Sequence, residues 1–182
     1  MSETTRERIL RAAADIVQHR GIARLTLDAV AETAGLSKGG LIYHFPSKEA
    51  LLAAMVEKLI TVTERDIDAH RENDTAPGSW TRGYLAACSP DNANAEADNR
   101  LAVAVLAATA GEPHLLAPMR ERQSQWRTAL GADGIPVDDA LVVRLAADGL
   151  WMNDLFGIPV VSEAERRLVL ERLTELSGGD RS

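Results

Sequence analysis

The sequence predicts an all-α protein of about nine helices, and three features support this fold class. Apolar residues recur every three or four positions through most of the 182-residue chain, as on one face of a helix, while convincing strand-type alternation is absent. Short clusters of Gly, Pro, Asp and Asn separate these periodic segments. Several segments begin with Ser or Thr, whose side chains accept hydrogen bonds from the first backbone N–H groups of a helix.

Four helices are predicted in the first 70 residues. Thr4 and Glu7 have the spacing of a capping box at the start of the first helix, which Gly21 ends. Thr26 caps the second helix, and Gly35 ends it because glycine accepts the left-handed backbone of such a stop.

Two more of these helices follow at once. Ser37 caps a short helix over residues 38–44, which Phe45-Pro46 breaks, and Ser47 caps a long helix that runs to about His70. The remaining helices are predicted at Trp80–Cys88, 95–110 and 115–130, from Asp138 or Asp139 to near Phe156, and from Ser162 to about Leu176.

The composition is that of a globular protein, with 46% hydrophobic and 26% charged residues. The chain has no apolar run of 18 residues, and residues 1–11 lack the apolar core of a signal peptide. We therefore expect a cytoplasmic protein with no membrane contact. Cys88 is the only cysteine, which excludes an intrachain disulfide, and a buried apolar role is favoured over a reactive thiol.

Residues 26–48 have the spacing of a helix-turn-helix, with Gly35-Leu36-Ser37 as the turn. The second helix of this motif lies in the major groove of DNA with its first residues nearest the bases. Lys38 would then reach a phosphate or a guanine edge. Gly39 and Gly40 would let the backbone approach DNA closely, although each weakens an isolated helix by about 1 kcal/mol.

Three further side chains fit the same interface. Tyr43 and His44 can donate hydrogen bonds to phosphates or contact bases, and Lys48 stands in the first turn of the next helix, where anions bind. The alternative, from spacing alone, is two ordinary core helices joined by a glycine turn.

Charge is unevenly distributed along the chain. Residues 1–50 hold seven Lys/Arg and six Asp/Glu, whereas residues 51–182 hold thirteen and twenty-one, so the net charges are +1 and −8. A near-neutral head on an acidic body suits a compact DNA reader with a few well-placed cations. It does not suit a protein that coats DNA through bulk charge.

The string LTLDAVAETAGLSKGGLIYHFPSKEALLAAM resembles the DNA-binding domain of the TetR family of bacterial repressors, over about residues 5–60. The matching positions are Gly21, Thr26, Val30, Ala31, Ala34, Gly35, Ser37, Gly40, Tyr43, His44, Phe45, Ser47, Lys48, Glu49 and Leu51. The resemblance implies that double-stranded operator DNA is contacted by Thr26, Ser37, Lys38, Gly40, Tyr43, His44 and Lys48.

This resemblance also implies a division of the chain. Residues 1–50 form the DNA-binding domain, with the helix-turn-helix at about 27–46, and residues 51–182 form a helical effector-binding and dimerisation domain. In similar proteins the last two helices build a four-helix bundle between two subunits. The expected interface residues are Leu141, Leu145, Gly149, Met152, Leu168 and Leu173.

A homodimer is favoured because one short recognition helix reads few bases, and two-fold pairing supplies a second half-site. The alternative is that both final helices simply close the core of one subunit. Small residues on the long helix, Ala146, Ala147 and Gly149, would allow another helix to come close.

Similar proteins hold a small-molecule pocket in the middle helices, at about 80–132. Such pockets are mostly apolar with a few polar anchors. The candidates for lining it are Trp80, Tyr84, His114, Met119, Trp126, Trp151, Asn153, Asp154 and Phe156. The alternative for each residue is an ordinary place in the core or on the surface.

The expected function is therefore sequence-specific regulation of transcription by a repressor that a small-molecule effector releases. No cofactor, metal site or enzyme activity is expected, because the four histidines are scattered and neither a G-x-S-x-G elbow nor a phosphate loop is present. The alternatives are a DNA-binding or interaction protein without an effector, a transcriptional activator, and a helical enzyme with a similar head.

Overall fold

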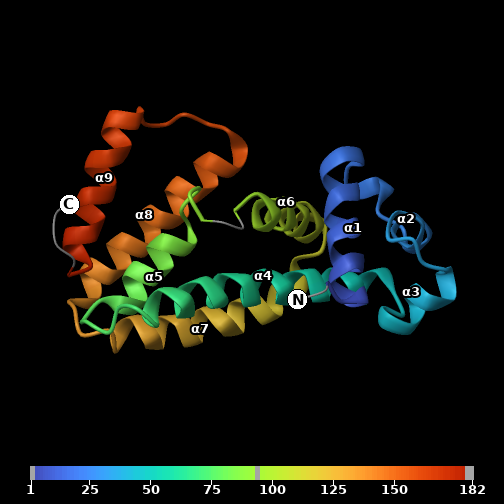
Figure 1. Ribbon diagram of the computed structural model, residues 1–182, viewed down its shortest axis with the longest axis horizontal. Coiled ribbons are helices and arrows are strands. Elements are labelled where there is room, and N and C mark those ends of the chain that lie inside the picture. Colours follow the sequence, from blue (N-terminus) through green and yellow to red (C-terminus); the bar gives the residue numbers. More distant parts are fainter. Residues whose placement is uncertain (1–2, 93–94, 179–182) are drawn as a thin grey trace. The chain divides into compact units, whose positions relative to one another are not determined.

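The computed structural model describes residues 3–92 and 95–178, which form nine α-helices and no strand, as predicted (Figure 1). The helices are α1 (Thr5–Arg20), α2 (Leu27–Thr33), α3 (Lys38–His44), α4 (Lys48–Arg71), α5 (Ser79–Ala87), α6 (Ala95–Gly111), α7 (Ala117–Gly131), α8 (Val137–Phe156) and α9 (Glu163–Leu176). Two short 3-10 helices, η1 (Ile22–Arg24) and η2 (Pro113–Leu116), precede α2 and α7.

The predicted helix starts are present as hydrogen-bonded caps. At α1 the Glu7 N–H donates to the Thr4 hydroxyl at 3.2 Å while the Thr4 N–H donates to the Glu7 carboxylate at 3.0 Å. Ser162 and Glu165 form the same reciprocal pair at α9. These local contacts satisfy N–H groups that have no partner inside the helix.

Two predicted boundaries were wrong near prolines. The segment 115–130 is not one helix, because the tighter turn that starts at Pro113 precedes α7. The helix expected to open at Asp138 or Asp139 begins at Val137 instead, directly after Pro136. Proline lacks a backbone N–H and holds a fixed φ, so it fits at or just before the first turn of a helix.

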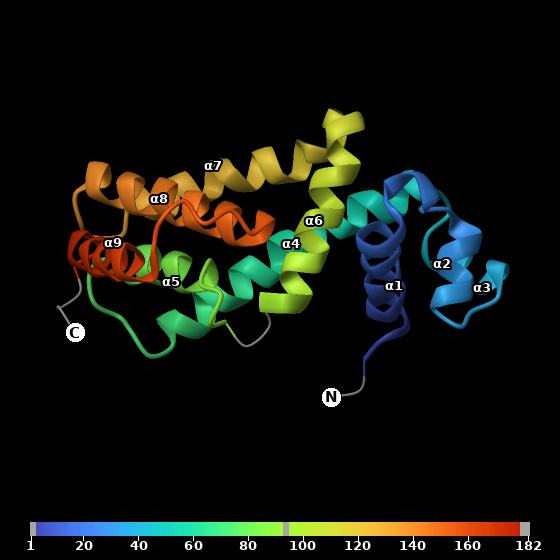
Figure 2. The same ribbon diagram turned by 90° about the horizontal axis from the view of Figure 1, so that it is seen from above.

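The chain divides into two compact units, and the first comprises residues 1–60 and 96–121. Within it α1 contacts α2 and α2 contacts α3, and both views show these three helices gathered together (Figure 2). Its core is apolar and includes Ile9, Leu10, Ile16, Val30, Leu41, Leu51, Met55, Leu101 and Val105. This core fixes the position of the helix-turn-helix.

The second unit comprises residues 61–95 and 122–182, in which α8 packs against α5 and α9. Its buried residues include Ile67, Trp80, Tyr84, Trp126, Leu130, Ala140, Val143 and Leu173. No helix in the described ranges is long and apolar enough to cross a membrane. The functional boundary at residue 50 stays a prediction.

Candidate functional site

The turn between α2 and α3 has the backbone that the sequence predicted. Gly35 has φ +66°, in the left-handed region. The Leu36 N–H donates to the Ala31 carbonyl at 2.9 Å, and the Gly35 N–H donates to the Glu32 carbonyl at 3.1 Å. This pair of bonds closes the end of α2, and a side chain at position 35 would strain it.

The two glycines at the start of α3 have different surroundings. The Gly40 N–H donates to the Ser37 hydroxyl at 3.1 Å, and a methyl group at position 40 would lie 3.3 Å from that oxygen. A methyl group at Gly39 would meet no atom within 4 Å. Gly40 therefore leaves room for the cap, whereas the surface at Gly39 is open.

Helix α3, the second helix of the predicted helix-turn-helix, has one buried and one exposed side. Leu41 is fully buried and Phe45, just after the helix, is 3% exposed, while Tyr43 is 86% exposed. The rings of Tyr43 and His44 meet edge to face, with centroids 5.3 Å apart. An exposed tyrosine on a helix with a buried opposite face is available to a partner.

Lys38 already has a partner inside the protein. Its Nζ lies 3.0 Å and 3.2 Å from the two carboxylate oxygens of Asp28, in the first turn of α2. Sequence reasoning placed Lys38 at DNA but missed this contact. The two residues are ten positions apart, and only the folded turn brings them together.

The remaining predicted DNA-binding residues stand at the starts of α2 and α4. Thr26 is exposed and its hydroxyl accepts from the Ala29 N–H at 3.1 Å. Lys48 is half-buried in the first turn of α4, which is capped by the Ser47 hydroxyl at 3.0 Å from the Ala50 nitrogen. The eight predicted residues thus lie at the starts of three consecutive helices and along α3, all in the first unit.

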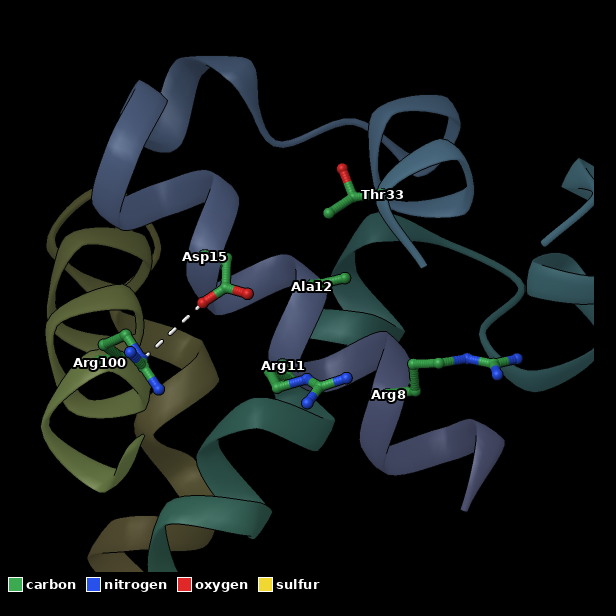
Figure 3. Close-up of a pocket in the computed structure, with 6 residues that line it drawn as sticks. All are labelled: Arg8, Arg11, Ala12, Asp15, Thr33 and Arg100. Atoms are coloured by element: carbon green, nitrogen blue, oxygen red, sulfur yellow. Dashed lines mark ion pairs between the residues drawn. The ribbon is translucent and has the colours of Figure 1, made fainter. Parts of the chain in front are cut away.

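A hollow of about 310 Å³ lies in the same unit, lined by Arg8, Arg11, Ala12, Asp15, Thr33 and Arg100 (Figure 3). Two of its three arginines form ion pairs. Arg100 contacts Glu96 at 2.9 Å and Asp15 at 3.8 Å, and Arg11 contacts Glu3 at 2.9 Å. This polar lining differs from the apolar pocket that the sequence analysis expected for an effector.

Three candidate ligand residues meet in the second unit. Trp80 stacks on Tyr84 with ring centroids 5.5 Å apart, and Trp126 meets Tyr84 edge to face at 5.9 Å. Arg144 joins them, with its guanidinium 5.1 Å from the Tyr84 ring centre and 5.6 Å from that of Trp126. We call Trp80, Tyr84, Trp126 and Arg144 the aromatic cluster.

Arg144 was missed by sequence reasoning because a charged residue in an amphipathic helix is expected to face solvent. It is only 7% exposed and donates a hydrogen bond to the Gln123 side chain. The only signal in the sequence is its spacing from Ala140 and Ala147, which share the buried face of α8.

Polar groups border the aromatic cluster. The Tyr84 hydroxyl donates to Asp148 at 2.6 Å, and burial raises the pKa of that hydroxyl above its usual range. Burial also raises the pKa of the nearby Cys88 thiol to about 12, so this thiol is protonated at neutral pH. The Trp126 indole donates to Glu64 at 3.1 Å. The second unit thus buries three aromatic rings beside polar groups.

The other candidate ligand residues lie on α8 and in the first unit. Asp154 forms a two-pronged ion pair with Arg166, at 2.7 and 2.9 Å, which ties α8 to α9. Phe156 is 56% exposed, and Trp151 and Asn153 are half-buried. His114 and Met119 belong to the first unit, where His114 Nε2 lies 3.1 Å from Glu49.

Large apolar side chains are exposed on α8, on α9 and between them. They are Val137, Leu141, Val142, Leu145, Phe156, Ile158, Val160 and Leu168, and we call them the apolar face. Gly149 is exposed and Met152 is half-buried beside them on α8. Leu173, which the sequence analysis grouped with the interface, is 4% exposed and lies in the chain's own core. Among the described residues, no three His, Cys, Asp or Glu side chains gather to hold a metal.

Comparison with known families identifies both parts of the chain. Residues 9–55 match the model for bacterial regulatory proteins of the tetR family. Residues 78–178 match the model for the tetracyclin repressor-like C-terminal domain. The two matches together account for most of the chain, including α2, α3, α8 and α9.

Individual relatives agree with these families. The transcriptional regulator RutR of Escherichia coli K12 is 39% identical over 77 residues, which are 42% of this chain and 36% of RutR. A transcriptional regulator from Rhodococcus sp. Rha1 has the same fold, with a TM-score of 0.67, 24% identity and coverage of 96% and 95% of the two chains. The multidrug binding protein EbrR, solved with imidazole, has a TM-score of 0.59 and 25% identity, with coverage of 94% of this chain and 96% of EbrR.

Proposed function

The chain belongs to the TetR family of bacterial regulatory proteins, and on this premise we propose that it regulates transcription as a homodimer on double-stranded operator DNA. We propose further that it is a repressor, acting in the cytoplasm, which a small-molecule effector releases from the operator. The observation that carries the DNA-binding role is α3, which is anchored by Leu41 and presents Tyr43 almost fully to solvent.

The electrostatics of the head support this role. Three helices begin there with hydroxyl caps, at Thr26, Ser37 and Ser47, and helix starts carry a partial positive charge that favours phosphate. Lys38 and Lys48 stand in two of these first turns. Such a site attracts DNA at a few defined points although the whole chain has a net charge of −7.

The apolar face supports the homodimer. Leu145 and Leu168 are 69% and 65% exposed, and they lie on the two helices that the family resemblance assigns to the interface. Several large apolar side chains exposed on two helices in contact are uncommon on a monomer and typical of a subunit contact. Two copies paired through α8 and α9 would bury it in a four-helix bundle.

The aromatic cluster supports an effector site in the second unit. Its three rings are only 5–7% exposed, so an effector would reach them only by opening this packing, and the polar groups of Asp148 and Gln123 beside the rings would then anchor it. The relative EbrR is described as a multidrug binding protein, and another solved relative as a gamma-butyrolactone receptor. An effector would release DNA only if it bound the DNA-free arrangement of the dimer more tightly than the DNA-bound one.

The DNA-binding proposal is tested by selecting duplexes from a random pool with the purified protein and measuring their affinity by fluorescence anisotropy. We expect one enriched sequence with two related halves, bound by two or four chains. Tyr43→Ala should weaken this binding by roughly tenfold or more, as expected for loss of a direct contact, without lowering thermal stability. Failure to enrich any sequence would contradict the proposal.

The effector proposal is tested by titrating the DNA complex with a panel of small aromatic and cationic compounds. A true effector should change the fluorescence of the buried tryptophans and lower the affinity for the selected duplex. Trp126→Phe should reduce the change in tryptophan fluorescence, while Tyr43→Ala should leave that change intact. A reporter gene behind the selected duplex then separates repression from activation.

A further inference from the structure

The pairing of Lys38 with Asp28 joins the first turns of α2 and α3 at the surface proposed to meet DNA. Both side chains are exposed, at 63% and 69%, so the pair is open to solvent and to any partner. Lys38 follows the cap Ser37, and Asp28 lies two residues after the cap Thr26. The pair therefore sits among residues already assigned to the interface.

The helix dipoles explain why the pair forms in this arrangement. The positive end of α2 favours Asp28, whereas the positive end of α3 disfavours a cation at Lys38. Asp28 thus offsets an unfavourable position for Lys38 and holds its ammonium group. Because the pair is exposed, it is weak enough for DNA to displace.

We propose that Asp28 is a specificity-determining residue, which restrains Lys38 so that only well-placed DNA groups recruit it. This inference rests on the proposed DNA-binding function. A lysine side chain that has no ion-pair partner neutralises any nearby phosphate, whatever the DNA sequence. A lysine held by Asp28 must exchange one acceptor for another, so loosely placed phosphates of non-operator DNA gain little from it. A guanine edge or a phosphate that the operator places directly at Lys38 competes better with Asp28 for the ammonium group.

The salt dependence of binding gives this proposal a measurable form. The logarithm of affinity falls with the logarithm of salt concentration, with a slope of about 0.9 for each phosphate that a cation neutralises. With Asp28 present, Lys38 contributes little to the slope on non-operator DNA. Asp28→Asn should free it and steepen that slope by about one unit per head, or about two per dimer.

The experiment compares a duplex selected from a random pool with the same duplex in shuffled sequence, across a salt series. The proteins are the wild type, Asp28→Asn, Lys38→Gln, the double variant and Glu32→Gln. Glu32 is the matched control because it lies on the same helix as Asp28 and its substitution removes the same negative charge. The ion pair of Lys38 is with Asp28, so Glu32→Gln leaves that pair in place. The double-variant cycle separates release of Lys38 from simple removal of a negative charge.

We expect Asp28→Asn to tighten binding to the shuffled duplex by roughly five- to tenfold near 0.1 M salt and to narrow the preference for the selected duplex. This effect should largely disappear in the Lys38→Gln background. The inference is overturned if Asp28→Asn matches Glu32→Gln, or if its effect persists without Lys38. A wild type that binds both duplexes equally would overturn the proposed function itself, and the inference with it.

Discussion

Gly39 is the position in α3 where stability and DNA binding should respond in opposite directions. A methyl group there meets no atom within 4 Å, so Gly39→Ala should raise the free energy of unfolding by about 1 kcal/mol, through helix propensity alone. The same methyl group would stand between the backbone and DNA and should weaken binding by roughly tenfold.

Denaturant unfolding and fluorescence anisotropy on one protein preparation would measure both effects. Gly111→Ala is the control, because a methyl group there also meets no atom within 4 Å and the residue lies at the end of α6. If Gly39→Ala bound the selected duplex as tightly as the wild type does, close approach of the backbone at this position would be refuted.

Residues of the head could be predicted from sequence where they act locally. Ser37 and Gly35 serve groups within five positions of themselves, so a pattern of consecutive letters reveals them. The Asp28 contact to Lys38 and the burial of Arg144 depend on how separate helices pack. Asp28 and Lys38 are both exposed and ten positions apart, so no local pattern pairs them, and the spacing of Arg144 from Ala140 and Ala147 is the one local sign of its burial.

The start of α5 shows the same limit at the scale of a helix. Asp133, from the segment after α7, accepts the N–H groups of Trp80 and Thr81 at 2.9 and 2.8 Å. It therefore caps a helix more than fifty positions earlier in the chain. α1 and α9 carry their caps in their own sequence, and those starts were predicted; α5 borrows its cap, and its start was placed one residue late.

The connection between α4 and α5 should make stability depend on pH. Arg82 donates two hydrogen bonds to Asp74, at 2.7 and 2.9 Å, and these hold the pKa of Asp74 well below its ordinary value of 3.8. A carboxyl group whose pKa is lowered by folding stabilises the protein at pH values above the pKa that the group has in the unfolded chain. That contribution is lost as the pH falls below about 3.8, because the unfolded state then takes up the proton first.

Melting curves from neutral pH down to about pH 3 would show the onset of this loss. Asp74→Asn should have a lower melting temperature at neutral pH and a shallower decline in acid. Asp68→Asn is the control, since Asp68 is 73% exposed with one long contact, of 3.9 Å, to Arg71. Equal acid sensitivity of wild type and Asp74→Asn would show that this pair does not contribute.

Two leucines of α9 should separate the core of the subunit from its apolar face. Leu173 is 4% exposed, whereas Leu168 is 65% exposed. Leu173→Ala should lower the free energy of unfolding by about 2–5 kcal/mol, as cavities in packed cores do. Leu168→Ala should have little effect on a single subunit, and urea unfolding at low protein concentration would measure the difference. Equal losses of unfolding free energy in the two variants would contradict this separation of core from apolar face.

At the scale of the whole molecule, assembly and DNA binding should be coupled. One head offers little net positive charge, because the seven Lys/Arg of residues 1–50 are offset by six Asp/Glu. Tight binding then requires two heads on two half-sites, and the apolar face must hold them together. A regulator built in this way reads an operator through its symmetry as much as through its side chains.

Leu145→Glu tests this coupling. The residue is 69% exposed on α8, so the substitution should leave the subunit folded while placing a charge in the proposed dimer contact. Light scattering should show monomers, and the slope of affinity against salt should fall to about half, since one head neutralises half as many phosphates. Gln125→Glu, which adds the same charge at an exposed site on α7, should change neither quantity. A Leu145→Glu protein that stays dimeric would move the interface away from α8, whereas a monomer with the full slope would mean that a single head suffices to read DNA.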